Sequence, residues 1–240
     1  MLLYMLRSNK KILGVIGGMG PYATMTFFKK FIKYNKKAVK DQDHYPLYIL
    51  NDPEILDRTN SIIKGKNLDI ICKRLGENAV KLENMGCDYL VMPCNTAHYF
   101  YDEIQENVEI PIISLIDETL YEIQDKNSFG LLSTMGTVFT KVYDKSAYDL
   151  KLDICIPNVN QQDRLSEIIY DIKGNKITED FIVKKRKELL KICDEMNGDN
   201  NVNTFVLGCT ELCILGKMSR YNFVDPMDIV IKKFYDLNNY

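Results

Sequence analysis

Short apolar runs alternate with longer segments of helical periodicity along most of this chain. The runs at residues 11–16, 47–50, 89–92 and 110–115 have the length and composition of buried β-strands. Apolar side chains at three- and four-residue spacings predict a helix over 68–83, which Gly86 ends. Further helices are predicted over 25–32, 96–106, 118–124 and 227–237. Strands that alternate with helices in this way predict a parallel sheet with right-handed crossovers.

The chain also repeats itself. SFGLLSTMGTVFT, residues 128–140, aligns with ILGVIGGMGPYAT near the N-terminus, so that Gly14 pairs with Gly130, Gly20 with Gly136 and, in the same register, Met19 with Met135 and Thr24 with Thr140. A second match aligns TFVLGCTE with YLVMPCNT and pairs Cys94 with Cys209. The distance along the chain between the matched residues is one residue shorter here than in the first match. Two independent matches indicate two copies of one structural unit.

The repeat predicts the domain organisation. We expect an α/β fold with two pseudo-symmetric domains, each a mainly parallel sheet flanked by helices, with the active site in the cleft between them. Residues 1–113 and 222–240 form the first domain, which carries Cys94, and residues 114–221 form the second, which carries Cys209. The C-terminal helix would thus return to the first domain.

Composition narrows the classes of partner. A net charge of −2 and the absence of a lysine- and arginine-rich block argue against nucleic acid or an anionic membrane as the main partner, and favour a small molecule. No apolar run is long enough to span a bilayer, and residues 1–6 are too short for a signal-peptide core, so we expect a cytoplasmic protein. Seven scattered cysteines and two histidines fit neither a disulfide scaffold nor a zinc finger.

The paired cysteines carry the candidate chemistry. Each follows a predicted strand, and the carboxyl edge of a parallel sheet is where open α/β folds place ligands. Two equivalent thiols on opposite sides of one substrate suit racemisation, in which a thiolate removes a proton from one face of a carbon and a thiol returns one to the other. Helix N-termini at Asn95 and Thr210 would lower the thiol pKa values. Donors to stabilise the carbanion would come from Thr96, Thr137 and Thr210.

Two other segments allow a functional and a structural interpretation. The turn with Gly17, Gly18 and Gly20 would wrap a small anion or serve only as a tight turn. Arg58 would clamp a carboxylate or form a surface ion pair with the neighbouring Asp57.

The blocks GGMGPYAT, VMPCNTAH and VLGCTELCIL, with PEILDRTNSII, resemble the aspartate/glutamate racemase family, which works without pyridoxal phosphate, and within it the aspartate racemase branch. The resemblance runs from about residue 11 to 228. It implies that Cys94 and Cys209 are the acid/base pair, that Asn95, Thr96 and Ala97 bind a substrate carboxylate, and that Arg58 and Lys173 hold the charges of a dicarboxylic amino acid. It also implies no cofactor, no metal and a homodimer.

Alternatives remain open at this point. Ser133 and Met135 depart from the family pattern, which leaves aspartate, glutamate or broader specificity undecided. A maleate isomerase or arylmalonate decarboxylase activity would use a cysteine in the same place, and a non-catalytic amino-acid binding protein would share the scaffold. His98 would tune Cys94 or serve as a structural histidine. Glu211 would orient the second site or cap its helix.

Overall fold

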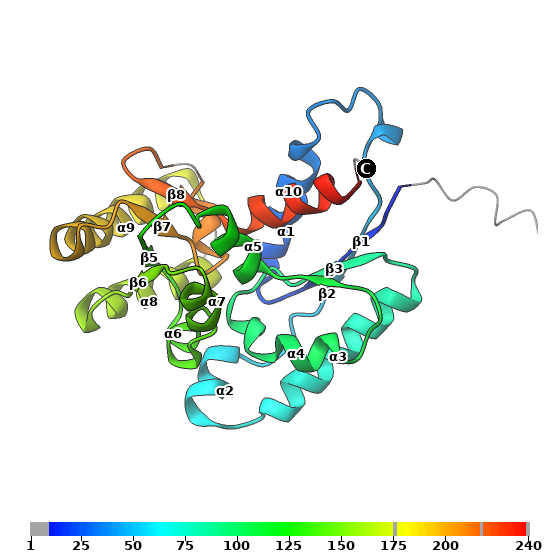
Figure 1. The fold of residues 1–240 in the computed structure, drawn as a ribbon, viewed down its shortest axis with the longest axis horizontal. Helices are drawn as coiled ribbons and strands as arrows, with labels where there is room; N and C mark the ends of the chain where they lie inside the picture. The colour runs from blue at the N-terminus through cyan, green and yellow to red at the C-terminus, as the bar shows by residue number, and fades with distance from the viewer. Residues whose placement is uncertain (1–9, 175–176, 217, 239–240) are drawn as a thin grey trace, which may run out of the picture.

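The fold consists of two four-stranded parallel sheets, each flanked by helices (Figure 1). The computed structural model describes residues 10–174, 177–216 and 218–238. The strands are β1 (Leu13–Gly17), β2 (Leu47–Asn51), β3 (Tyr89–Val91), β4 (Ile112–Ile113), β5 (Ser128–Leu131), β6 (Asp153–Cys155), β7 (Thr204–Val206) and β8 (Asn222–Val224). All neighbouring strands pair in parallel. The predicted α/β class, with two similar units, is confirmed.

The helices of the first unit are α1 (Pro21–Tyr34), α2 (Arg58–Lys64), α3 (Leu68–Asn84) and α4 (Tyr101–Gln105), followed by α5 (Leu115–Glu122). Those of the second unit are α6 (Met135–Thr140), α7 (Asp144–Asp149), α8 (Val159–Gly174) and α9 (Glu179–Asn200), followed by α10 (Pro226–Asn238). Short 3-10 helices occur at η2 (Asp41–Asp43), η3 (Thr96–Phe100) and η4 (Leu212–Leu215).

The sequence repeat corresponds to a repeat of topology. The strand orders are β2-β1-β3-β4 and β6-β5-β7-β8, so each strand of the first sheet has a counterpart in the second. Gly14 in β1 and Gly130 in β5 occupy matching positions. A Cβ atom at Gly14 would lie 2.6 Å from Leu90 Cδ2, and one at Gly130 would lie 2.4 Å from Phe205 Cδ1. Both glycines therefore let a side chain of the next strand in the sheet cover the backbone.

The two units exchange their last helices. The helix α10 follows the last strand of the second sheet but packs against α1 of the first unit (Figure 1). In the same way, α5 follows the last strand of the first sheet but packs against α7 of the second unit. α5 and α10 also pack against each other. Because β8 pairs with β7 in the second sheet, the expected change of domain at residue 222 is too early, and the chain crosses to the first unit only after Val224.

A continuous apolar core joins the units. Alternate residues of β1 and β3 point to opposite faces of the first sheet, so Leu13, Val15 and Val91 pack with α1 and α10 while Ile16 and Leu90 pack with α3. The first of these two clusters extends into the second unit through α8, α9 and η4. Because this one cluster is buried between both units, the hydrophobic effect stabilises the position of one sheet relative to the other.

Some predicted boundaries shift for identifiable local reasons. The predicted strand at 110–115 is shortened to β4, because the Ser114 side chain accepts a hydrogen bond from the Asp117 N–H and so caps α5. α5 accordingly begins at Leu115, before the predicted 118. The helix predicted over 96–106 is divided into η3 and α4.

The turn after β1 packs closely against the turn after β2. Gly18 has φ of +92°, and a Cβ atom there would lie 2.3 to 2.4 Å from backbone atoms of Asp52. The Gly18 N–H donates to Thr24 Oγ1 at 2.9 Å. This N–H is therefore used inside the turn rather than offered to an anion. The conformation and the contact both require glycine at this position.

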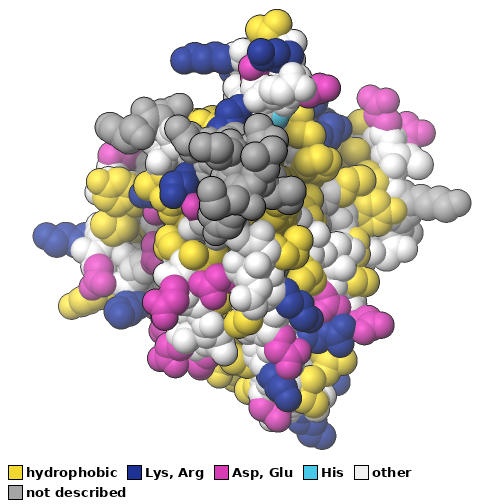
Figure 2. All heavy atoms as spheres, turned by 90° about the vertical axis from the view of Figure 1, so that its right-hand side faces the viewer, with side chains coloured by type: hydrophobic (Ala, Val, Ile, Leu, Met, Phe, Trp, Pro, Cys, Tyr) yellow, Lys and Arg dark blue, Asp and Glu magenta, His cyan; other side chains and the backbone are white. Residues whose placement is uncertain are grey.

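The surface carries charges of both signs. Figure 2 shows lysine and arginine side chains interspersed with aspartate and glutamate on one face, among scattered hydrophobic groups. No single sign of charge dominates that face. The small-molecule partner expected from the sequence stays a prediction.

Substituting Gly18→Ala should lower the free energy of unfolding by roughly 2 kcal/mol or more, because the methyl group meets backbone atoms and the residue must keep a positive φ. Urea unfolding followed by circular dichroism measures this. Gly198→Ala is the matched control, since Gly198 lies within α9 with open space around it, and it should leave stability unchanged or raise it by about 0.5–1 kcal/mol. Equal midpoints for Gly18→Ala and the unmodified protein would contradict the packing role.

Candidate active site

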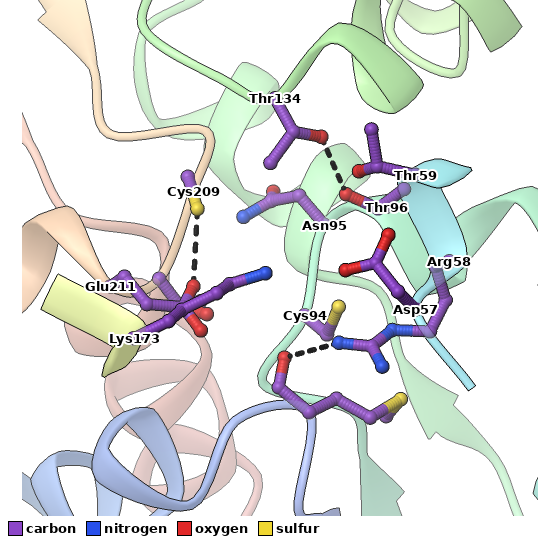
Figure 3. A pocket seen from close by; sticks show the side chains of 12 residues that line it. Asp57, Arg58, Thr59, Cys94, Asn95, Thr96, Thr134, Lys173, Cys209 and Glu211 are labelled. Atoms are coloured by element: carbon purple, nitrogen blue, oxygen red, sulfur yellow. Dashed lines mark hydrogen bonds between the residues drawn. The ribbon is translucent and has the colours of Figure 1, made fainter. Parts of the chain in front are cut away.

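A small pocket, with a cavity volume of about 10 Å³, lies where the carboxyl ends of the two sheets face each other. On this measure the two units close to leave about the space of one water molecule between their side chains. Both units contribute to its wall, which Figure 3 shows in close-up. The lining residues are Met19, Asp57, Arg58, Thr59, Cys94, Asn95, Thr96, Thr134, Lys173, Cys209, Thr210 and Glu211.

The structure brings the two cysteines to this one pocket. Cys94 lies in the loop after β3 and Cys209 in the equivalent loop after β7, and their side chains enter from the first and second unit respectively (Figure 3). Cys94 is 6% exposed and Cys209 is 5% exposed. Both thiols are thus largely removed from water, at positions that the repeat makes equivalent.

Buried hydroxyl groups connect the two halves of the wall. Thr96 Oγ1 of the first unit lies 2.9 Å from both Thr134 Oγ1 and Thr137 Oγ1 of the second. Close approach of α2 and α6 permits this contact, since a Cβ atom at Gly136 would lie 2.9 Å from Thr59 Cα. These hydrogen bonds fix the loop that carries Cys94 against the second unit.

Two further hydrogen bonds link the Cys94 loop to the second unit. The Thr210 hydroxyl donates to Pro93 O at 2.9 Å, and the Tyr143 hydroxyl donates to Asn95 Oδ1 at 2.6 Å. Asn95 Nδ2 has no hydrogen-bond partner in the described part of the protein, although the side chain is only 2% exposed. Its amide group is therefore oriented with its donor end free for a ligand.

Not every expected residue lines the pocket. Seven do: Cys94, Cys209, Arg58, Asn95, Thr96, Lys173 and Thr210. The side chain of Ala97 packs in the apolar core with α3, and Thr137 lies behind Thr96 and Thr134. Ala97 thus brings no side chain to the pocket, and Thr137 acts on it through its neighbours.

Arg58 is buried and only partly satisfied. Its guanidinium group donates to the main-chain oxygens of Ile55, Leu56 and Met19, while its Nε has no partner in the described part of the chain. The neighbouring Asp57 instead caps α2, accepting from the Asn60 N–H at 2.7 Å. Arg58 is 7% exposed, which argues against a surface ion pair at this position.

An ionic network fixes the loop before Arg58. Arg74 on α3 donates to both carboxylate oxygens of Asp52, at 2.6 and 2.7 Å, and also to Glu54. The buried Asn78 side chain donates to Asp52 as well. The hydrogen bonds from Arg74 hold the pKa of Asp52 below its ordinary value. The loop between β2 and α2 is therefore anchored to α3.

The second unit supplies one cation and one anion. Lys173, in the last turn of α8, extends its ammonium group into the pocket (Figure 3). Burial acts to lower the pKa of Lys173, but neighbouring acidic groups, of which Glu211 is the foremost, outweigh it and the pKa is raised. Glu211 is 3% exposed, and its Oε2 accepts a hydrogen bond from the Cys209 thiol at 3.1 Å. Glu211 therefore contacts the second cysteine directly.

The environment of Cys209 reverses the expected pKa shift. Burial raises the pKa of the Cys209 thiol well above its ordinary value, the Glu211 carboxylate raises it further, and Lys173 acts in the opposite direction. No helix starts at Thr210, because η4 begins only at Leu212. The expected lowering of the Cys209 pKa by a helix N-terminus is therefore wrong, and the thiol is the resting form.

His98 has both ring nitrogens occupied. Nε2 accepts a hydrogen bond from the Leu115 N–H at 3.0 Å, so Nδ1 carries the proton and donates to Cys94 O at 2.9 Å. Burial lowers the pKa of His98 to about 4. The neutral imidazole thus joins the Cys94 loop to the start of α5, which supports the structural interpretation of this residue.

Four residues that line the pocket were not predicted as site residues from the sequence: Met19, Asp57, Thr59 and Thr134. Asp57 and Thr59 flank Arg58, so their position at the start of α2 was the available signal. Thr134 comes directly before Met135, which the sequence repeat matches with Met19. It is the N-cap of α6, and in this position it also lines the pocket.

Residues 10–174, 177–216 and 218–238 contain no cluster of three or more histidine, cysteine or acidic side chains suited to a metal ion. Within the same ranges no helix has the length and apolar character needed to cross a bilayer.

The burial of neutral His98 predicts a pH effect on stability. The folded state disfavours the proton between pH 6.5 and about 4, so stability is full above pH 6.5 and is lost as the pH falls through this interval, by an amount on the order of 3 kcal/mol. Urea unfolding at pH 7.5, 6, 5 and 4.5 should show a steeper loss for the unmodified protein than for His98→Gln. Parallel curves for the two proteins would contradict this explanation.

Comparison with known proteins agrees with this geometry. The chain is similar to the broad specificity amino-acid racemase RacX of Bacillus subtilis (strain 168), with 34% identity over 140 residues, which cover 56% of this chain and 59% of that protein. The match thus spans less than two thirds of that relative's length. A solved structure of Picrophilus torridus aspartate racemase has 29% identity and a TM-score of 0.79, covering 95% of this chain and 94% of that one.

A second solved structure, of an aspartate racemase homologue from Pyrococcus horikoshii OT3, has 25% identity and a TM-score of 0.76, covering 96% of this chain and 100% of that one. The family model described as Asp/Glu/Hydantoin racemase matches residues 16–234. This range includes both cysteine loops and nearly all of both sheets. The chain therefore belongs to the Asp/Glu/hydantoin racemase family.

Proposed function

We propose that the protein is a cofactor-independent amino-acid racemase that interconverts the enantiomers of a dicarboxylic amino acid, with aspartate as the first candidate. The observation that carries the proposal is the presence of Cys94 and Cys209, from equivalent loops of two similar units, in one closed pocket. Such a pair suits proton removal on one face of an α-carbon and proton delivery on the other.

The surroundings of Cys209 suggest how the two cysteines divide the reaction. The raised pKa of Cys209 favours the neutral thiol, which suits a general acid. Cys94, as a thiolate, would remove the α-proton of one enantiomer while Cys209 protonates the opposite face. For the other enantiomer the roles reverse, and Lys173 is the group that lowers the cost of a Cys209 thiolate. The pair keeps one proton throughout: Cys94 gains the α-proton of the substrate as Cys209 gives up its own, and proton exchange with water restores the starting arrangement before the next turnover in the same direction.

Stabilisation of the carbanion is the harder requirement. Proton loss beside a carboxylate places negative charge on that carboxylate, and donors in a pocket without bulk water stabilise it best. The free Nε of Arg58 and the free Nδ2 of Asn95 are such donors, because both side chains are buried and lack a partner at these atoms. The Lys173 ammonium group adds positive charge from the second unit.

The charges of the pocket support a dicarboxylic substrate. Arg58 and Lys173 come from different units and would each neutralise one carboxylate. An outer extension of about 210 Å³ shares both residues with the pocket and is lined further by Gly20, Pro21 and Tyr22. This extension would admit a side chain longer than that of aspartate. Glutamate and broader specificity, as in the name of the Bacillus subtilis relative, therefore belong to the same proposal.

The alternative activities fit this pocket less well. A decarboxylase of the arylmalonate type needs one proton donor and an apolar pocket, whereas here two thiols, two cations and two acids line the wall. A binding protein without catalysis has no requirement for a thiol on each side of its ligand. The polar wall and the second cysteine favour the racemase.

Cys94→Ala and Cys209→Ala should each lower the rate of interconversion of L- and D-aspartate by at least about 100-fold, because each removes one of the two proton-transfer groups. Chiral chromatography of reactions without added pyridoxal phosphate measures the rate. Cys72→Ala is the matched control, since Cys72 lies on α3 outside the pocket, and this variant should keep the unmodified rate. Substantial turnover in either pocket variant would rule out the two-base scheme.

A further inference from the structure

Three buried polar atoms without partners belong to side chains that line the same pocket. In the described part of the protein the buried side-chain atoms that lack a hydrogen-bond partner are His44 Nδ1, Arg58 Nε, Asn95 Nδ2, Thr119 Oγ1 and Glu211 Oε1. Those of Arg58, Asn95 and Glu211 belong to residues that line the pocket and are at least 93% buried. Leaving such atoms unpaired costs free energy, so together they indicate the polar groups that a ligand must bring.

The three atoms differ in their hydrogen-bonding role. Arg58 Nε and Asn95 Nδ2 are donors, which carboxylate oxygens would accept. Glu211 Oε1 is an acceptor, and an acceptor cannot pair with a carboxylate of a dicarboxylic ligand. A ligand that satisfies all three therefore carries a donor, and a cationic donor fits the charge of Glu211 best.

The Glu211 side chain is held so that Oε1 remains available. Its other oxygen, Oε2, accepts from the Cys209 thiol at 3.1 Å. A Cβ atom at Gly20 would lie 3.3 Å from Oε1, so a side chain at this position would come into close contact with the oxygen, and glycine avoids that contact. Glu211 lines both the pocket and its outer extension, which places the carboxylate on their shared wall.

We propose that Glu211 Oε1 binds the α-ammonium group of the substrate and thereby selects α-amino acids over acids of the same length that lack the amine. The assignment rests on the proposed function, because it orients a substrate whose α-carbon lies between the cysteines. An ammonium group bound to Glu211 lies next to Cys209, since one carboxylate contacts both. The positive charge then offsets the negative charge that Glu211 presents to Cys209.

Asp57 is the other acid in the pocket and is the weaker candidate. Its side chain already accepts the Asn60 N–H at 2.7 Å as the cap of α2, and the residue is half-buried. Its loss would affect the start of the helix that carries Arg58. Asp57→Asn keeps a capping side chain and is therefore a suitable matched comparison for Glu211→Gln.

The test measures binding without turnover, by isothermal titration calorimetry on the full chain with Cys94→Ala. The probes are L-aspartate and succinate, which differ by the amine, with L-glutamate and glutarate as a longer pair. We expect the amino acid of at least one pair to bind roughly 10- to 100-fold more tightly than its partner. Adding Glu211→Gln should remove this preference and leave the affinity for the diacid within about threefold. Adding Asp57→Asn should keep the preference.

Three results would overturn the assignment: a preference that persists in Glu211→Gln, an equal loss of affinity for both members of a pair, or a preference abolished by Asp57→Asn alone. Binding of none of the four probes would overturn it as well. Exchange of the α-hydrogen, measured on the protein with both cysteines intact, tests racemisation separately. A Glu211-dependent preference without any exchange would keep the ligand assignment and reject the proposed reaction.

Discussion

The structure depends on one constraint, which is that the carboxyl edges of two parallel sheets face each other across one pocket. The exchange of α5 and α10 between the units produces this arrangement, because each unit is completed by a helix that follows the last strand of the other. A single apolar cluster then runs from α1 and α10 through to α8 and α9. Opening the pocket by separating the units would expose part of that cluster and is opposed by the hydrophobic effect.

The pocket differs from most of the protein interior in that several of its buried polar atoms have no hydrogen-bond partner. Elsewhere in the described part of the chain, buried polar side chains find partners, as His98 does with the Cys94 carbonyl and the Leu115 N–H, with His44 Nδ1 and Thr119 Oγ1 as the exceptions. Around the two cysteines, Arg58, Asn95 and Glu211 each keep one atom unpaired. Each such atom costs about 1–3 kcal/mol unless a ligand satisfies it. Concentration of this cost at one place is typical of a functional site.

The sequence predicted the architecture because its signals are local and occur twice. The apolar runs specify strands, and the match of Gly14 with Gly130 and of Cys94 with Cys209 predicts two equal sheets, as observed. The limits of β4 and α5 were wrong because the Ser114 cap, a single side-chain contact, decides them. The exact point of crossing after Val224 was not accessible either, since strand pairing is a long-range property.

The sequence predicted which residues form the candidate site better than it predicted their pKa values. The cysteines, Arg58 and Lys173 were found from motifs, and the structure places them in one pocket. The direction of the Cys209 pKa shift was missed, because it depends on burial and on the orientation of Glu211, two residues away. Thr134 was missed because its contact with Thr96 crosses between units that are distant in sequence.

The central claim is that two groups on opposite faces of the α-carbon transfer the proton, and the position of deuterium in early products tests it most directly. The protein is incubated with unlabelled L-aspartate in heavy water, and mass spectrometry of the separated enantiomers follows the α-hydrogen during the first few per cent of any reaction. The two-base account predicts that newly formed D-aspartate carries deuterium while the remaining L-aspartate stays almost unlabelled. Deuterium at equal rates in both enantiomers, or D-aspartate that retains the original hydrogen, would contradict it.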